Sequence, residues 1–283
     1  MSKYSETKPY KPRGKRTAIL ARAWELVQSV DYSVSLRWLF YKLFQEGYYT
    51  DKKHYKTQFG GALSDARHGY YKGWRPDTLT DGTRATFYRG HGPYTPQEWV
   101  NQLAENVVCS LNKWHAQDYY VELWYEARAM HQQFAHYTEH ITLRPMSGKP
   151  SIPFKWEIAK DLENFAGYGL PIVILYFGDL DETGQEIPTT LVKDVRKWCS
   201  VDFKFIYCGL TSAQVKKYNV PQNPEKPGYQ WEGLPDAGAK EIIESSTAPF
   251  IRLDRFSPIV AQEQPVTDFV RGELAKLTAP NGI

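Results

Sequence analysis

The 283-residue sequence contains few cysteines and no long hydrophobic run. Its three cysteines, Cys109, Cys199 and Cys208, are widely spaced in apolar surroundings. That number and spacing fit neither a disulfide framework nor the paired ligands of a zinc site, so we expect buried thiols in a reducing compartment. No stretch has the length and apolarity of a membrane span, and the first residues lack the apolar core of a signal peptide. These missing features predict a cytoplasmic protein that contacts no membrane.

A glycine-rich nucleotide-binding loop is also missing. Gly60 and Gly61 lie in FGGALSD and Gly82 lies in DGTRATF, but neither stretch has the Gly-Lys-Ser/Thr ending of a Walker loop. If the protein takes part in an ATP-driven reaction, we therefore expect the ATPase to be a separate subunit.

The net charge of +3 is the sum of two unequal parts. Up to Asp118 there are 18 Lys and Arg residues against 11 Asp and Glu residues, whereas from Tyr119 onward the numbers are 17 and 21. A basic first part and an acidic second part indicate a polyanion-binding surface joined to a carboxylate-bearing site, although chance surface charge is the alternative. The polyanion that we expect is DNA.

Residues 1–93 predict a basic arm and a winged-helix-like DNA-binding domain. Residues 1–16 carry six Lys or Arg residues and two prolines, as is typical of a flexible arm. Apolar residues at helical spacing predict three helices within residues 17–93, the third over residues 51–68, and a hairpin is expected over residues 73–92. In a winged-helix arrangement the third helix would enter the major groove. The expected DNA-binding residues are Lys52, Lys53, Lys56, Arg67, Arg84 and Arg89.

Residues 94–118 predict a connecting helix. Thr95, Pro96 and Glu98 have the spacing of a capping box with proline in the first turn. The residues expected on its buried face are Trp99, Leu103, Val107 and Leu111.

Residues 119–283 predict an α/β domain. Strands are expected over residues 119–124, 140–144, 171–177 and 203–208. Helices are expected near residues 152–168 and 184–198, with one or two more toward residue 283. Strands that alternate with helices predict an open, mainly parallel sheet of the Rossmann-like kind.

Carboxylates follow two of the predicted strands. Asp179 and Asp181 come directly after the apolar run IVILYF, and Glu126 follows the strand that begins near residue 119. Ligands bind at the carboxyl ends of parallel strands, and a few carboxylates beside a substrate phosphate are the surroundings that Mg²⁺ prefers. We therefore expect Glu126, Asp179 and Asp181 to hold one Mg²⁺ or Mn²⁺ ion at a scissile phosphate. The alternative is that these acids only begin helices.

A second interpretation of the same residues is a phosphatase. Asp179-Leu180-Asp181-Glu182-Thr183 also fits the Asp-x-Asp-x-Thr signature of haloacid dehalogenase-like enzymes, with Asp179 as the nucleophile. Those enzymes place the motif near the start of their core and use a later acidic pair, neither of which is found here.

With Glu126 and the DLDETG motif in view, the chain resembles TOPRIM proteins related to the topoisomerase VI A subunit and the meiotic double-strand-break transesterase. Glu126 matches the family's glutamate, and Asp179, Asp181 and Gly184 match its Asp-x-Asp-x-x-Gly motif. The family's usual Lys and acidic residue after the glutamate are replaced by Ala127 and Arg128. The combination of helices and a TOPRIM domain also resembles phage and mobile-element proteins.

The resemblance extends to a tyrosine in the first part of the chain. The family carries a nucleophilic tyrosine in an Arg-x-x-Tyr-Tyr motif, which Arg37, Phe40 and Tyr41 match except for phenylalanine at the first tyrosine position. The resemblance implies that Tyr41 attacks a DNA phosphorus with help from Arg37, in a homodimer in which the tyrosine of one subunit meets the metal site of the other. A tyrosine that only packs between helices is the alternative. Glu232, before Leu-Pro, resembles a further acidic residue of the site; starting a helix is its alternative role.

Three hypotheses on function follow. The first is DNA cleavage through Tyr41, as in a type IIB topoisomerase A subunit, and the second is a TOPRIM nuclease that uses metal-activated water. The third is a non-catalytic DNA-binding module. Each of them would associate the protein with the nucleoid if it acts in a cell.

Overall fold

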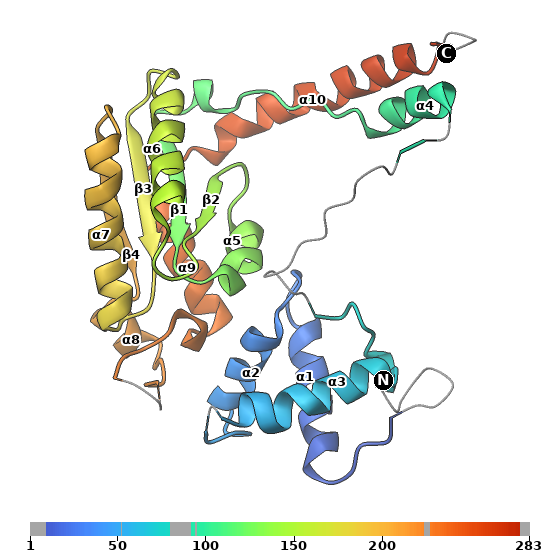
Figure 1. Cartoon of the computed structure of the whole chain (residues 1–283), viewed down its shortest axis with the longest axis vertical. Coiled ribbons are helices and arrows are strands. Elements are labelled where there is room, and N and C mark those ends of the chain that lie inside the picture. The colour runs from blue at the N-terminus through green and yellow to red at the C-terminus, as the bar shows by residue number, and fades with distance from the viewer. Residues whose placement is uncertain (1–9, 52, 80–91, 94, 224–226, 278–283) are drawn as a thin grey trace.

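The computed structural model describes residues 10–51, 53–79, 92–93, 95–223 and 227–277. Within these ranges the chain forms a helical unit, a parallel-sheet unit and a pair of helices that extends from the sheet unit (Figure 1). The chain is thus a mixed α/β protein, as the sequence predicts.

The helical unit packs three helices around an aromatic core. Helices α1 (Lys15–Gln28), α2 (Leu36–Gln45) and α3 (Gly60–His68) are its main elements, and a π-helical turn over Tyr55–Phe59 leads into α3. Ser35 caps α2 by accepting from the Trp38 backbone N–H, as its side-chain chemistry favours. Apolar residues at helical spacing on α2 and α3 are buried together: Leu39, Phe40, Leu43, Ala62, Leu63 and Ala66. Most of the hairpin predicted over residues 73–92 lies outside the described residues, and residues 73–79 form no strand.

The helix that connects the two units is shorter than the predicted helix over residues 94–118. Helix α4 spans Pro96–Asn106 and begins with the predicted capping box of Thr95 and Glu98. After Asn106 come two β-branched valines, which favour extended chain, and residues 107–113 are not helical.

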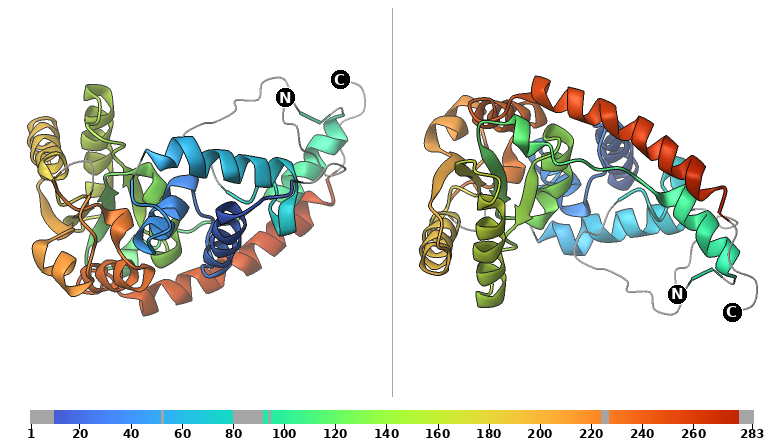
Figure 2. Two further views of the ribbon diagram at one scale, coloured as in Figure 1. Left: turned by 90° about the horizontal axis from the view of Figure 1, so that it is seen from below. Right: turned by 90° about the horizontal axis from the view of Figure 1, so that it is seen from above.

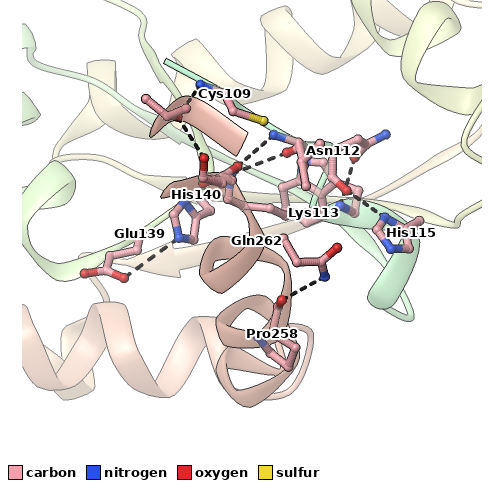
Figure 3. Close-up of polar contacts among 12 residues, drawn as sticks. Cys109, Asn112, Lys113, His115, Glu139, His140, Pro258 and Gln262 are labelled. Atoms are coloured by element: carbon pink, nitrogen blue, oxygen red, sulfur yellow. Dashed lines mark hydrogen bonds and ion pairs between the residues drawn. The ribbon is translucent and has the colours of Figure 1, made fainter. Parts of the chain in front are cut away.

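The predicted buried face of the connecting helix is largely exposed. Trp99 is 55% exposed, and Leu103 and Leu111 are also open to solvent. Among the helices that the structure describes, α10 (Leu253–Leu274) is the one that packs closely on α4 (Figure 2). The apolar stripe of α4 is therefore covered on one side. The stretch after α4 is tied to α10 by polar contacts: the Cys109 N–H donates to Thr267 Oγ1 and Lys113 pairs with Glu263 (Figure 3).

A four-stranded parallel sheet forms the centre of the second unit. Its strands are β1 (Tyr120–Tyr125), β2 (Thr142–Pro145), β3 (Ile172–Phe177) and β4 (Phe203–Gly209), in the order β2-β1-β3-β4. All three pairings are parallel, which confirms the predicted sheet. Every residue of β1 and β3 is buried, as expected for central strands covered on both faces.

Helices cover both faces of the sheet. On one face α6 (Ile152–Ala166) packs against α7 (Glu182–Trp198); on the other α5 (His131–Tyr137) packs against α9 (Asp236–Thr247) (Figures 1 and 2). A short helix, α8 (Ser212–Lys217), follows β4. Crossovers between parallel strands are right-handed, so the helix after β1, which leads to β2, and the helix after β3, which leads to β4, lie on opposite faces.

The strand order places a topological switch point between β1 and β3. From β1 the chain moves to β2 on one side, and it then returns to β3 on the other side of β1. The crevice outside the carboxyl ends of two such strands is where open α/β sheets bind ligands. These ends face the helical unit (Figure 1). Within the described residues, no helix is long and apolar enough to cross a membrane.

Candidate active site at the sheet edge

The ends of β1 and β3 bring the predicted acidic residues together. Glu126 directly follows β1, and its Oε2 accepts a hydrogen bond of 2.9 Å from the backbone N–H of Asp179, which lies two residues beyond β3. Asp179 and Asp181 are both buried, and Glu126 is partly buried. Two of the three predicted acidic residues, on separate stretches of chain, are therefore in contact, through the carboxylate of one and the backbone of the other.

The turn after β3 depends on a glycine. Gly184 lies in the first turn of α7, where its N–H donates to Asp181 Oδ1 at 2.8 Å and so completes an N-cap. A Cβ atom at Gly184 would collide with the carbonyl oxygen of Asp179 and would come within 3.0 Å of Glu126 Oε2. Only glycine allows the helix to start this close to both acids.

A segment from far along the chain completes the site. Leu180 and Tyr229 exchange two backbone hydrogen bonds, of 2.8 and 2.9 Å, which fix residues 229–232 against the acidic turn. Trp231, two residues after Tyr229, donates its backbone N–H to Asp179 Oδ1 at 2.9 Å. Glu232 follows and is buried, and neither of its carboxylate oxygens accepts a hydrogen bond from the described residues.

Helix α2 brings the predicted tyrosine and arginine to the same place. Arg37 Nε lies 3.1 Å from Glu232 Oε1, and the Tyr41 hydroxyl donates to the side-chain oxygen of Gln230. The Arg37 guanidinium lies 5.7 Å from the centre of the Tyr41 ring. Sequence analysis missed Gln230; its position beside Glu232 was the available signal.

The acidic groups strongly influence one another. Burial raises the pKa of Asp179 well above its ordinary value, and the nearby charges of Glu232 and Glu126 raise it further. Burial also raises the pKa of Tyr41, with Glu232 as the next cause, while Arg37 opposes the shift. The charge of Glu232 raises the pKa of Arg37. The surroundings of Asp179 therefore disfavour its ionised form, while Glu232 is paired with Arg37.

The donor set suits a hard cation, although it is not assembled as a finished metal site. Among the residues that the structure describes, no group of three or more His, Cys, Asp or Glu side chains is placed to hold a metal. Mg²⁺, however, usually takes one or two carboxylates together with waters and substrate phosphate. Such an ion would stabilise Glu232, whose buried oxygens accept no hydrogen bond from the described chain, and Asp179, whose pKa is raised by burial and by neighbouring carboxylates.

A cleft of about 860 Å³ lies beside this acidic turn, but of the described residues Asp181, Tyr41 and Glu232 do not line it. Glu126 and Asp179 lie on its sheet side, and its walls carry three arginines: Arg37 of α2, Arg67 of α3 and Arg128 just after β1. Arg128 is the residue at which the sequence departs from the family pattern. The cleft thus combines carboxylates with basic side chains from both units.

The other predicted DNA-binding residues fall into two groups. Lys53 is exposed, pairs with Asp51 at 2.7 Å and is not among the described residues that line the cleft. The remaining positions lie outside the described residues, wholly or in their side chains: Lys52, Lys56, Arg84 and Arg89.

A second buried acid on β1 belongs to the core. Glu122, which sequence analysis missed, accepts hydrogen bonds from Tyr120, Trp124 and both ends of the Arg144 guanidinium, at 2.7–3.1 Å. Arg144 also pairs with Asp161 of α6 at 2.9 Å. Arg144 thus neutralises a buried acid of the core.

A scan against models of known protein families found no match, and searches of curated proteins and of solved structures found none.

Proposed function

We propose that the protein is a metal-dependent DNA-cleaving enzyme with a TOPRIM-like site behind a winged-helix-like DNA-binding domain. The observation that carries the proposal is the contact between Glu126 and Asp179 at the switch point of the sheet, in a cleft that arginines from both units also line. Carboxylates at the carboxyl ends of parallel strands and basic side chains around them are the groups that phosphodiester cleavage needs.

In this proposal Asp179, Glu126 and Glu232 would hold Mg²⁺ or Mn²⁺, directly or through water, and Asp181 shapes the turn as the N-cap of α7. The bound ion would supply Lewis-acid activation of the phosphate and charge stabilisation at the leaving oxygen. Arg37, which reaches Glu232 from the other unit, is placed to stabilise negative charge on the reacting phosphate.

Two nucleophiles are compatible with this site. In the first route the Tyr41 oxygen attacks phosphorus, the bond from phosphorus to the sugar oxygen breaks, and the phenolic proton leaves to a carboxylate. In the second route water attacks phosphorus and passes a proton to a carboxylate, and the same bond breaks. In both routes the leaving sugar oxygen takes up a proton from solvent. The raised pKa of Tyr41 and its hydrogen bond to Gln230 favour water, since both hold the phenol in its protonated form.

The placement of Tyr41 also bears on the partners. The resemblance implies a homodimer in which tyrosine and metal site come from different subunits, yet here Tyr41 lies beside Gln230 and Arg37 beside Glu232 of the same chain. One chain would therefore suffice for the second route. A homodimer and a separate ATPase subunit belong to the first route.

The phosphatase alternative receives less support. Asp179 would have to act as an ionised nucleophile, but it is buried, its pKa is raised, and its Oδ1 accepts from the Trp231 backbone. A non-catalytic DNA-binding module stays as the outcome in which no cleavage is found.

The decisive experiment compares cleavage by four proteins. End-labelled DNA is incubated with Mg²⁺ and with the wild type, Asp179→Asn, Tyr41→Phe or the matched control Tyr48→Phe, whose ring is exposed. We expect cleavage by the wild type and the control and none by Asp179→Asn. A labelled protein–DNA adduct that Tyr41→Phe loses would establish the tyrosine route; cleavage by Tyr41→Phe without adduct would establish hydrolysis. No cleavage by the wild type with Mg²⁺ or Mn²⁺ would refute the proposal.

A further inference from the structure

Two arginines of the cleft have no acidic partner among the described residues. Arg67 comes from α3 of the helical unit and Arg128 from the segment after β1, and neither forms a hydrogen bond or an ion pair with a carboxylate that the structure describes. By contrast, Arg22 and Arg144 each contact two acids. Cations held near a protein surface without an acid are typical of sites that receive an anion.

Arg67 is also partly withdrawn from water. It leaves α3 in the last turn, and its Nε donates to the backbone oxygen of Leu63 at 3.3 Å, so the rest of its guanidinium is left for the cleft. Burial lowers the pKa of Arg67, and no carboxylate among the described residues pairs with it to offset this effect. An anion with several oxygens would offset this cost, because guanidinium binds phosphate through two parallel hydrogen bonds.

Arg128 lines the same cleft from the sheet unit, two residues after Glu126, and its side chain is exposed. Glu126 and Asp179 of the acidic site line this cleft too, together with Arg37. A cleft that combines carboxylates with cations from both units matches a polyanion that carries one phosphate at the acids and others at the arginines.

We propose that Arg67 and Arg128 bind the backbone phosphates that flank the reacting phosphodiester, so that a nucleic-acid strand crosses the cleft from the helical unit to the sheet unit. This assignment rests on the proposed function, and it specifies how the substrate runs through the site. Arg37 then serves the central phosphate and the other two arginines set the position of the strand.

The test measures binding without cleavage. Fluorescence anisotropy of a labelled DNA oligonucleotide, as single strand and as duplex, is recorded in EDTA over a range of salt concentrations. We expect Arg67→Ala and Arg128→Ala each to weaken binding by about tenfold. Each should also reduce the slope of log K against log salt by about 0.7 for a single strand or about 0.9 for a duplex. Arg67→Lys and Arg128→Lys should recover most of the slope, because they keep the charge.

Arg75→Ala is the matched control. Arg75 belongs to the helical unit, is exposed beside Asp77 and does not line the cleft, so its loss should leave binding unchanged. Thermal melting of every variant checks that it is folded. Wild-type affinity and slope in folded Arg67→Ala and Arg128→Ala would overturn the assignment, as would an equal effect of Arg75→Ala.

The two proposals can fail separately. If DNA binding depends on Arg67 and Arg128 but the protein never cleaves DNA, the proposed path of the strand is supported and the proposed cleavage activity is refuted. Metal-dependent cleavage with normal DNA binding by both variants would refute the path alone.

Discussion

Two clusters of buried carboxylates lie on the same sheet, and they differ in how fully they are neutralised. Glu122, in the middle of β1, accepts from Tyr120, Trp124 and Arg144. Beyond the end of the same strand, Glu126 meets the turn after β3. Glu232, which faces Arg37 there, accepts no hydrogen bond from the described chain, although it is as well buried as a core residue.

The difference distinguishes a structural acid from a functional one. A buried charge is tolerated when hydrogen bonds and an opposite charge replace water, as they do for Glu122. Around Asp179, burial and then the nearby charges of Glu232 and Glu126 all raise its pKa. A stable fold retains such a cluster at a cost in stability, and enzyme sites are where this cost commonly occurs.

The largest effect should come from breaking the neutralised cluster. Arg144→Met leaves Glu122 buried without its cation, and we expect the free energy of unfolding to fall by about 3–5 kcal/mol. Urea denaturation measures this, with Lys149→Met as the control because the Lys149–Glu186 pair is exposed and should matter little. Adding Glu122→Gln to Arg144→Met should restore much of the loss. If Arg144→Met alone is as stable as Lys149→Met, the pair of Arg144 and Glu122 has no structural role.

A smaller loss is expected from crowding the acidic turn. Gly184→Ala places a methyl group against the Asp179 carbonyl and beside Glu126, so the turn must shift. We expect about 1–3 kcal/mol of destabilisation and a loss of any metal-dependent cleavage. Gly61→Ala is the matched control, since Gly61 also lies in a helix and a Cβ there meets nothing within 4 Å. It should be neutral or slightly stabilising, and equal losses in the two variants would show that the close approach at Gly184 is unimportant.

The sheet and its acidic edge could be predicted because they follow from local patterns. The uninterrupted apolar run of β3 and the run of β1, in which Glu122 is the one charged residue, predicted the two central strands. Carboxylates after each of them had to reach the same edge of a parallel sheet. That β1 is next to β3 was not visible, because strand order depends on packing between distant segments. The contact between Glu126 and Asp179 required this order.

Other parts of the site depend on contacts that no local pattern encodes. Residues 229–232 reach the acidic turn through pairing with Leu180, about fifty residues earlier in the chain, so Gln230 could not be linked to Tyr41. The same limit applies to α4. Its spacing predicted an apolar stripe, but a stripe does not tell how many neighbours will cover it, and Trp99 is left half exposed.

The smallest effect has the opposite sign and tests the unbalanced cluster. Asp179→Asn keeps an oxygen for the Trp231 N–H but removes the charge that burial, Glu232 and Glu126 oppose. We therefore expect this variant to lose activity and yet to gain roughly 0.5–2 kcal/mol of stability near neutral pH.

The pH dependence follows from the direction of the pKa shift. Below the ordinary pKa of Asp, about 4, the group is protonated in both folded and unfolded chains and contributes nothing. As the pH rises from there toward the raised pKa, the unfolded chain loses its proton first, so wild-type stability falls relative to Asp179→Asn. Thermal melts of both proteins should diverge with rising pH and converge toward pH about 4. Saturating Mg²⁺ should raise the melting temperature of the wild type more than that of the variant, because only the wild type keeps the full acidic cluster. A wild type that is more stable than Asp179→Asn at neutral pH without metal would place Asp179 with Glu122, among the acids that hold the fold together.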